Sequence, residues 1–259
     1  MATFGESVLP EGGVKGSESS FFLTMAIIMV AVVTAGFTVN LAMGRSTFAV
    51  PWPYHVHALV FFGWAALYLA QSFTIARGHV QLHRSLGRLA YGWIPAMVAI
   101  GVAIIIIVMR RTGGPFFFAQ NEFLFSNILL LFTFGFLSMI ALRQRRYTGW
   151  HRRLMMSAMS TLTGPGLGRL LPMPLMIPYA WKICIAITLL FPVAGMIADK
   201  RRYGRVHPAW WWGAGSIALV QIAASLLASS SWGVGVTKAI IAGYPGSARP
   251  IEAFLPPGF

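Results

Sequence analysis

Long apolar runs dominate the chain, and short segments rich in Gly, Pro or basic residues separate them. A helix needs roughly 17 to 25 residues to cross about 30 Å of hydrocarbon. The pattern therefore predicts an all-α integral membrane protein with seven transmembrane helices. The runs that reach the required length cover residues 21–43, 54–76, 88–109, 122–142, 153–171, 177–198 and 209–231.

The fifth predicted helix is the least regular of the seven. Its segment TLTGPGLGRLLP places Gly, Pro and Arg169 inside the apolar run. Pro and Gly interrupt membrane helices where neighbouring groups can satisfy the freed backbone. We therefore expect a short, kinked or partly re-entrant helix at this position.

A polar segment lies at each end of the predicted helices. The first residues include Glu6, Glu11 and Glu18 but only one basic residue, Lys15, unlike the basic start of a secretory signal. The first apolar run is therefore expected to be a retained helix. The end of the chain is rich in Gly and Pro and is expected to form a non-helical tail or cap. The predicted divisions are an amino-terminal segment at 1–20, a membrane domain at 21–231 and a tail at 232–259.

Composition points to lipid as the solvent and as a partner. The chain is 57% apolar and only 10% charged, so its polar surface is too small for a water-soluble globule. Its formal net charge of +14 would suggest nucleic acid in a soluble protein, but the basic residues lie in short loops between apolar runs. We therefore expect anionic lipids of the cytoplasmic leaflet as partners, and no nucleic acid. A larger membrane complex or a homo-oligomer stays open.

The basic residues divide unequally between the two sides that seven crossings create. Thirteen Lys and Arg fall on the side of the amino terminus, against six on the other side. Short loops rich in Lys and Arg stay in the cytoplasm. We therefore expect the amino terminus inside and the carboxyl terminus in the periplasm, in the inner membrane of a bacterium. The thirteen are Lys15, Arg77, Arg84, Arg88, Arg143, Arg145, Arg146, Arg152, Arg153, Lys200, Arg201, Arg202 and Arg205.

A threefold pattern recurs in the predicted cytoplasmic loops. In each loop an Arg stands six residues before a His, and each His directly precedes an odd-numbered predicted helix. Two loops agree further, as RRYTGWH and RRYGRVH. The pattern predicts one helix followed by three helical-hairpin repeats. The pairs are Arg77 and His83, Arg145 and His151, and Arg201 and His207.

Two interpretations of these histidines stay open. A His in the first turn of a helix feels the positive end of the helix dipole, which favours the neutral ring and a free lone pair. His83, His151 and His207 could therefore hold a metal ion together. Alternatively, each His and its nearby Arg bond loop carbonyls or lipid phosphates and set the depth of the helices. The candidate contacts for anionic headgroups are Arg77, Arg145, Arg153, Arg201 and Arg205.

Other membrane-embedded chemistry has few candidates. His57 follows Pro51 and Pro53 near the start of the second helix and could be an axial ligand of a b-type haem, although no second His lies at similar depth. The single cysteine, Cys184, excludes a disulfide within the chain and Cys-ligated metal clusters. No Asp or Glu falls in the middle of a predicted helix, which argues against a carboxylate proton relay.

Several segments resemble those of bacterial multi-pass membrane proteins to which no reaction is assigned. They are HALVFFGWAALYLAQ, LHRSLGRLAYGW, WHRRLMM and GRVHPAWWWG, and the similarity spans the second to seventh predicted helices. LHRSLG is also similar to the His-containing helix starts of b561-type membrane cytochromes. The resemblance implies a multi-helix topology with a polar cytoplasmic face, and it adds His57 and His83 as candidate ligands.

Three functions follow from these features. The first is a membrane-embedded binding or accessory protein that holds a lipid, a quinone or a partner complex without chemistry of its own. The second is a redox membrane protein that uses His-ligated metal or haem. The third, ranked last, is a transporter of a small anion attracted by the basic loops. The sequence leaves open whether the protein is an enzyme.

Overall fold

The computed structural model of the protein describes residues 13–256, and every regular element in that part of the chain is helical. Two short 3₁₀ helices, η1 (Met173–Met176) and η2 (Pro245–Ala248), accompany ten α-helices. The α-helices are α1 (Gly13–Ala42), α2 (Trp52–Ala76), α3 (Val80–Gly87), α4 (Ala90–Thr112), α5 (Gln120–Arg143), α6 (Thr148–Thr161), α7 (Gly164–Leu170), α8 (Ala180–Tyr203), α9 (Pro208–Ser229) and α10 (Ser231–Ile241).

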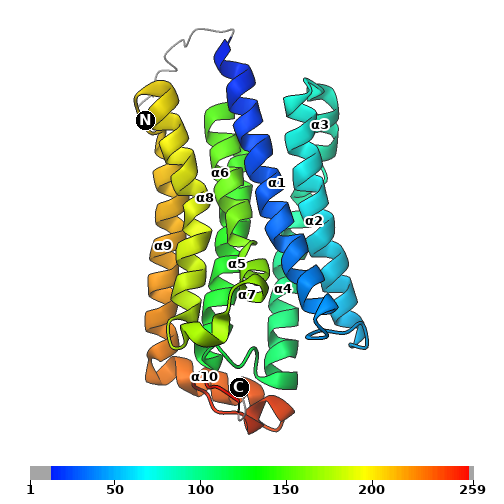
Figure 1. Ribbon diagram of the computed structural model, residues 1–259, viewed down its shortest axis with the longest axis vertical. Helices are drawn as coiled ribbons and strands as arrows, with labels where there is room; N and C mark the ends of the chain where they lie inside the picture. The colour runs from blue at the N-terminus through cyan, green and yellow to red at the C-terminus, as the bar shows by residue number, and fades with distance from the viewer. Residues whose placement is uncertain (1–12, 257–259) are drawn as a thin grey trace.

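The long helices form one bundle and run along its long axis (Figure 1). The short helix α3 lies at one end of the bundle, and α10 with the carboxyl terminus lies at the other. We call these the α3 end and the α10 end. Six described helices, α1, α2, α4, α5, α8 and α9, are long and apolar enough to cross a membrane. This confirms the all-α membrane class, with six candidate spans where the sequence predicted seven.

The fifth predicted helix, 153–171, is not continuous. The chain forms α6 and then α7, because Thr161 and Thr163 turn their hydroxyls back onto backbone carbonyls and Gly164 and Pro165 follow. In Figure 1, α6 starts at the α3 end and α7 lies farther along the bundle, beside α1. Gly166 allows this approach, because a Cβ there would lie 2.7 Å from the Val32 carbonyl oxygen.

The structure is helical in part of each predicted terminal segment. Helix α1 begins at Gly13, so Glu18 belongs to a helix and not to a separate segment at 1–20. The predicted non-helical tail at 232–259 contains α10, whose start is capped by the Ser230 hydroxyl accepting from the Gly233 amide. The tail does cap the bundle, since Arg249 donates to the carbonyls of Gly114 and Phe118. Residues 1–12 lie outside the described part.

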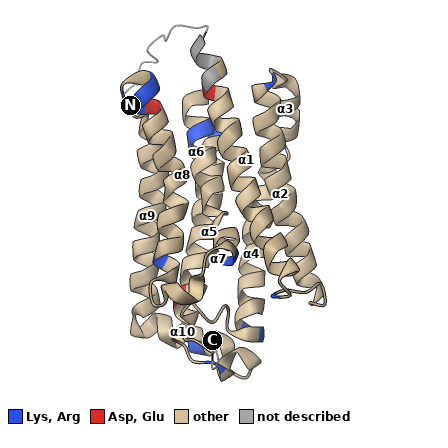
Figure 2. Ribbon diagram, viewed as in Figure 1, with Lys and Arg blue, Asp and Glu red and all other residues tan. Residues whose placement is uncertain are grey.

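Charged residues gather toward the two ends of the bundle, and long middle stretches of the helices carry none (Figure 2). Between the ends, one apolar core joins the helices and contains Trp64, Phe134 and Trp210. This distribution is the one that a hydrocarbon layer around the middle of a helical bundle requires.

Candidate functional site

A buried cluster of charges joins four helices at the α3 end of the bundle. It consists of Glu18 on α1, Arg152 and Arg153 on α6, Asp199 on α8 and Trp210 on α9, and we call it the ion-pair cluster. Arg153 and Asp199 are each only 2% exposed, and Glu18 is 4% exposed. Burying an unpaired charge this deeply would cost a large free energy, so each of these side chains is positioned to contact one of opposite charge.

Arg153 and Asp199 form the centre of this cluster. The Arg153 guanidinium donates to both carboxylate oxygens of Asp199, with Nε to Oδ2 at 2.8 Å and Nη2 to Oδ1 at 2.7 Å. Its Nη2 also donates to Glu18 at 3.0 Å, and its Nη1 donates to the Gly149 carbonyl at 3.1 Å. The planar fork of Arg suits such a two-point contact with a carboxylate.

Further donors reach the two acids. Trp210 Nε1 donates to Asp199 Oδ2 at 2.9 Å, the His207 amide donates to the same oxygen at 3.3 Å, and Arg152 pairs with Glu18 at 2.5 Å. The indole of Trp210 fits beside α8 because Gly195 has no side chain, and a Cβ there would overlap the ring. Two guanidinium groups therefore balance two carboxylates, and the carboxylate oxygens already accept strong donors. The ion-pair cluster is suited to fixing α1, α6, α8 and α9 together, and it offers no open position for a metal ion.

Two of the three predicted metal ligands lie together at the same end. The rings of His83 on α3 and His151 on α6 have their centroids 6.2 Å apart and stand nearly perpendicular, at 83°. His151 Nδ1 lies 2.8 Å from the Ala141 carbonyl oxygen, and His83 Nδ1 lies 3.4 Å from that of Gln71. Burial lowers the pKa of both rings from the ordinary value of a histidine.

His207 has a different role from the other two. Its Nδ1 accepts from the Ala209 amide at 3.1 Å, so the ring caps the start of α9. Its ring packs against Trp150, with centroids 5.5 Å apart, and burial together with the positive Arg153 lowers its pKa to about 4. Within residues 13–256 no group of three His, Cys, Asp or Glu side chains is arranged to hold one metal ion. The predicted triad is therefore not assembled, and His83 and His151 are left as a pair.

The predicted headgroup contacts separate into exposed and buried residues. Arg153 cannot reach a lipid headgroup because it is buried in the ion-pair cluster. Arg145 is exposed and donates from Nη1 to the Tyr91 hydroxyl at 2.7 Å. Arg77 lies over the Phe73 ring, and Arg201 and Arg205 are exposed at the same end.

The haem candidate lies far from the histidine pair. His57 packs its ring 4.2 Å from that of Phe61, near the beginning of α2. Because α2 carries the chain from there to the α3 end, His57 and His83 belong to opposite ends of the bundle. They cannot be ligands of one group.

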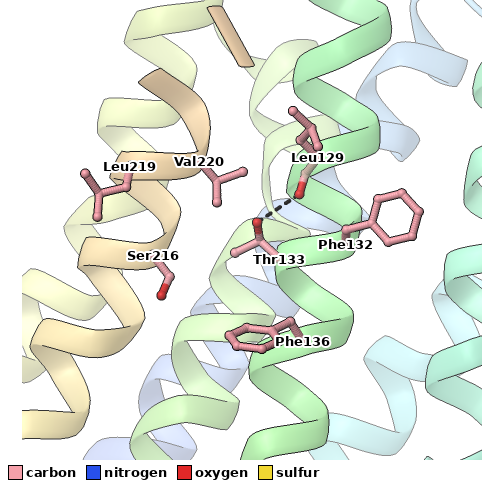
Figure 3. A pocket seen from close by; sticks show the side chains of 7 residues that line it. All are labelled: Leu129, Phe132, Thr133, Phe136, Ser216, Leu219 and Val220. Atoms are coloured by element: carbon pink, nitrogen blue, oxygen red, sulfur yellow. Dashed lines mark hydrogen bonds between the residues drawn. The ribbon is translucent and has the colours of Figure 1, made fainter. Parts of the chain in front are cut away.

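Two apolar grooves flank the outward ridge formed by Phe132 and Phe136 on α5. These rings are 52% and 57% exposed. The α5–α9 groove, drawn in Figure 3, has a volume of about 360 Å³ and is lined by Leu129, Phe132, Thr133, Phe136, Ser216, Leu219 and Val220. Its one dashed contact is the Thr133 hydroxyl donating to the Leu129 carbonyl within α5, and the Ser216 hydroxyl is the other polar side-chain group among these lining residues.

The α4–α5 groove is larger, at about 740 Å³, and a polar contact lies beyond its lining toward the α3 end. Its lining residues are Ile94, Pro95, Val98, Ala99 and Val102 on α4 and Phe132, Gly135, Phe136 and Met139 on α5. Tyr91 lies one turn before Ile94, and Arg145 lies just after the end of α5, so their hydrogen bond joins the two helices at the α3 end of this groove.

Sequence reasoning missed the ion-pair cluster. Glu18 was assigned to a separate segment, and Asp199 was discounted because it lies at the end of a predicted helix. One signal was available, since Asp199 is the only acid beside the basic run Lys200, Arg201 and Arg202. A lone acid in such a run is expected to have a specific cationic partner.

Compared with known proteins, the chain matches no family model, no curated sequence and no solved structure.

Proposed function

We propose that the protein is a membrane-embedded binding protein for an anionic phospholipid, an accessory role without a reaction of its own. One acyl chain occupies the α4–α5 groove, and the phosphate binds Arg145. The observation that carries this proposal is the position of the Arg145 to Tyr91 hydrogen bond beyond the lining of an apolar groove, toward the α3 end.

The dimensions of the groove suit a lipid chain. Its α4 lining extends from Ile94 to Val102, which at 1.5 Å per residue is roughly 12 Å along the helix. Ile94 and Met139 lie nearest the α3 end, and Val102 and Phe132 lie deepest. A fatty acyl chain bound there covers exposed aromatic rings and leaves its headgroup level with the loops.

The charges at the mouth of the groove suit a phosphate. Arg143, Arg145 and Arg146 are all exposed where α5 ends. Both hydrogen bonds of Arg145 come from Nη1, so within the described residues Nε and Nη2 stay available for two-point binding of phosphate oxygens. The Tyr91 hydroxyl accepts from this guanidinium and so ties it to the start of α4.

Native mass spectrometry of the purified protein tests this proposal. Released from detergent, the protein should retain phosphatidylglycerol more strongly than phosphatidylcholine. Arg145→Gln should lower the bound fraction of phosphatidylglycerol several-fold, and Ala99→Phe, which fills the exposed groove, should do the same. Ala96→Phe is the matched control, because Ala96 is also exposed on α4 but does not line the groove. Equal loss in all three variants, or none, would overturn the proposal.

We also propose a seven-pass topology with the α3 end in the cytoplasm of a bacterial cell. In this arrangement α6 and α7 together make the fifth crossing, and the three hairpins that follow α1 derive from one repeated unit. Thirteen basic residues against six support the orientation, and the recurring Arg and His spacing supports the repeat. The protein is then a multi-pass protein of the inner membrane.

A further inference from the structure

We propose that His83 and His151 together bind one divalent transition-metal ion, of the zinc, nickel or copper class, through their Nε2 atoms. The site is separate from the lipid-binding groove and does not depend on it. It joins α3 to the beginning of α6, two segments that are 68 residues apart in the chain and that adjoin through this pair of rings.

The distance between the rings is close to that of two imidazoles on one ion. A ligating nitrogen lies about 1.2 Å from the centre of its ring, and a bond to zinc is about 2.0–2.1 Å long. The two ring centres are therefore about 5.3 Å apart at a tetrahedral angle, and about 6.5 Å apart only when the two bonds are collinear. The observed separation of the His83 and His151 centroids is 6.2 Å. The two rings therefore have to approach each other by about 1 Å to share a tetrahedral ion.

The second nitrogen of each ring is held as a metal site requires. A backbone carbonyl can only accept, so Nδ1 of His151 carries the proton that it donates to Ala141, and Nδ1 of His83 donates to Gln71 in the same way. The lone pair of each neutral ring is therefore on Nε2. Metal-binding histidines are ordinarily oriented by this kind of hydrogen bond.

Positive charge surrounds the pair. Arg84 acts electrostatically on His83, and Arg145 acts on His151. The same cations disfavour a bare divalent ion, so an anion such as hydroxide, chloride or phosphate completes its coordination.

The side chain of Gln71 holds a polar atom without a partner. Its oxygen Oε1 is buried and makes no hydrogen bond within the described residues, and the backbone carbonyl of the same residue accepts from His83. A buried acceptor left unpaired costs about 1–3 kcal/mol. A water molecule bound to the ion can donate to this oxygen, and we assign Gln71 to the outer coordination of the site.

Metal titration of the full-length protein in lipid-depleted detergent tests the site. The chelator-stripped protein should bind about one zinc ion per chain, measured by elemental analysis after desalting. His83→Gln and His151→Gln preserve a donor for the carbonyls but remove the imidazole, and each should weaken zinc binding by at least about tenfold. His79→Gln is the matched control, because His79 lies four residues before His83 and is exposed.

The possible outcomes separate clearly. Loss of zinc in both variants, with retention in the His79 control and unchanged size-exclusion profiles, supports the site. Cobalt substitution should then give a visible absorption band that is lost in the same variants. Unchanged zinc content in both variants, or a haem absorption band in the untreated protein that depends on the pair, would overturn the proposal of a non-haem ion.

Discussion

At the scale of single residues, substitutions in the ion-pair cluster are expected to have the largest effect on stability. Replacing one member leaves its partners charged and buried, and breaking such a pair costs about 3–5 kcal/mol. Asp199→Asn should therefore lower the thermal unfolding temperature strongly, because Arg153 then lacks its two-point carboxylate. Glu252→Gln, at an exposed acid near the carboxyl end, is the control and should be close to neutral. A small effect of Asp199→Asn in a scanning fluorescence assay would show that the cluster is not a stabilising centre.

The low pKa of His207 predicts a dependence of stability on pH. Its pKa of about 4 in the folded protein lies below the ordinary value of 6.5, so the unfolded chain binds the proton more readily. Stability contributed by the neutral ring is present above pH 6.5 and is lost as the pH falls through about 4. The groups that face this ring are Arg152, Arg153, Glu18 and Asp199.

His207→Asn separates this effect from the capping role. Asn still accepts the hydrogen bond at the start of α9 but does not titrate. We expect the unfolding temperature of the variant to fall less than that of the unaltered protein between pH 7 and pH 4.5. Parallel pH profiles for the two proteins would exclude His207 as a source of acid sensitivity.

At this scale the sequence gives residue types and spacing but does not reveal which side chains meet. The Arg and His spacing located His83 and His151 but also suggested a third ligand, His207, because spacing alone does not reveal that Nδ1 of that ring caps α9. The pairing of Arg153 with Glu18, 135 residues apart, depends on how four helices pack. Hydropathy carries no information on that packing.

At the scale of elements, the apolar runs located the long helices well. The predicted runs 54–76 and 122–142 correspond to α2 (Trp52–Ala76) and α5 (Gln120–Arg143) within two residues at each end. The fifth run, 153–171, is apolar enough to predict one helix, but the structure divides it. The hydroxyls of Thr161 and Thr163 bond backbone carbonyls there, and Pro165 interrupts the helical hydrogen bonding. The helical start of α1 was missed because polar residues near a membrane surface can continue a helix that hydropathy alone ends.

The contact of α7 with α1 gives a prediction for this scale. Gly166→Ala places a methyl group 2.7 Å from the Val32 carbonyl oxygen and 2.8 Å from the Val33 Cα, and backbone atoms cannot yield as a side chain can. Such overpacking typically costs about 1–3 kcal/mol. Gly92→Ala on α4 meets nothing within 4 Å and should be neutral or stabilising by up to about 1 kcal/mol. Thermal unfolding of the two variants tests whether α1 and α7 pack this closely. Equal unfolding temperatures for Gly166→Ala and Gly92→Ala would contradict it.

At the scale of the whole molecule, the proposed topology places the two ends of the bundle in different compartments. A reporter enzyme active only in the periplasm should be active when fused after Ile241 and inactive when fused after Arg205. A reporter that fluoresces only in the cytoplasm should give the reverse pattern. Equal behaviour of the two fusions would mean that α9 does not cross the membrane, and an inverted pattern would reverse the orientation.

The central claim is that an anionic phospholipid lies along α4 and α5, and photo-crosslinking in native-like membranes tests it most directly. A diazirine amino acid at position 99, in the α4–α5 groove, should capture phosphatidylglycerol in preference to phosphatidylcholine, and Arg145→Gln should abolish the preference. The same probe at position 96, outside the groove, should capture both lipids without preference. Equal, unselective capture at both positions would contradict the account.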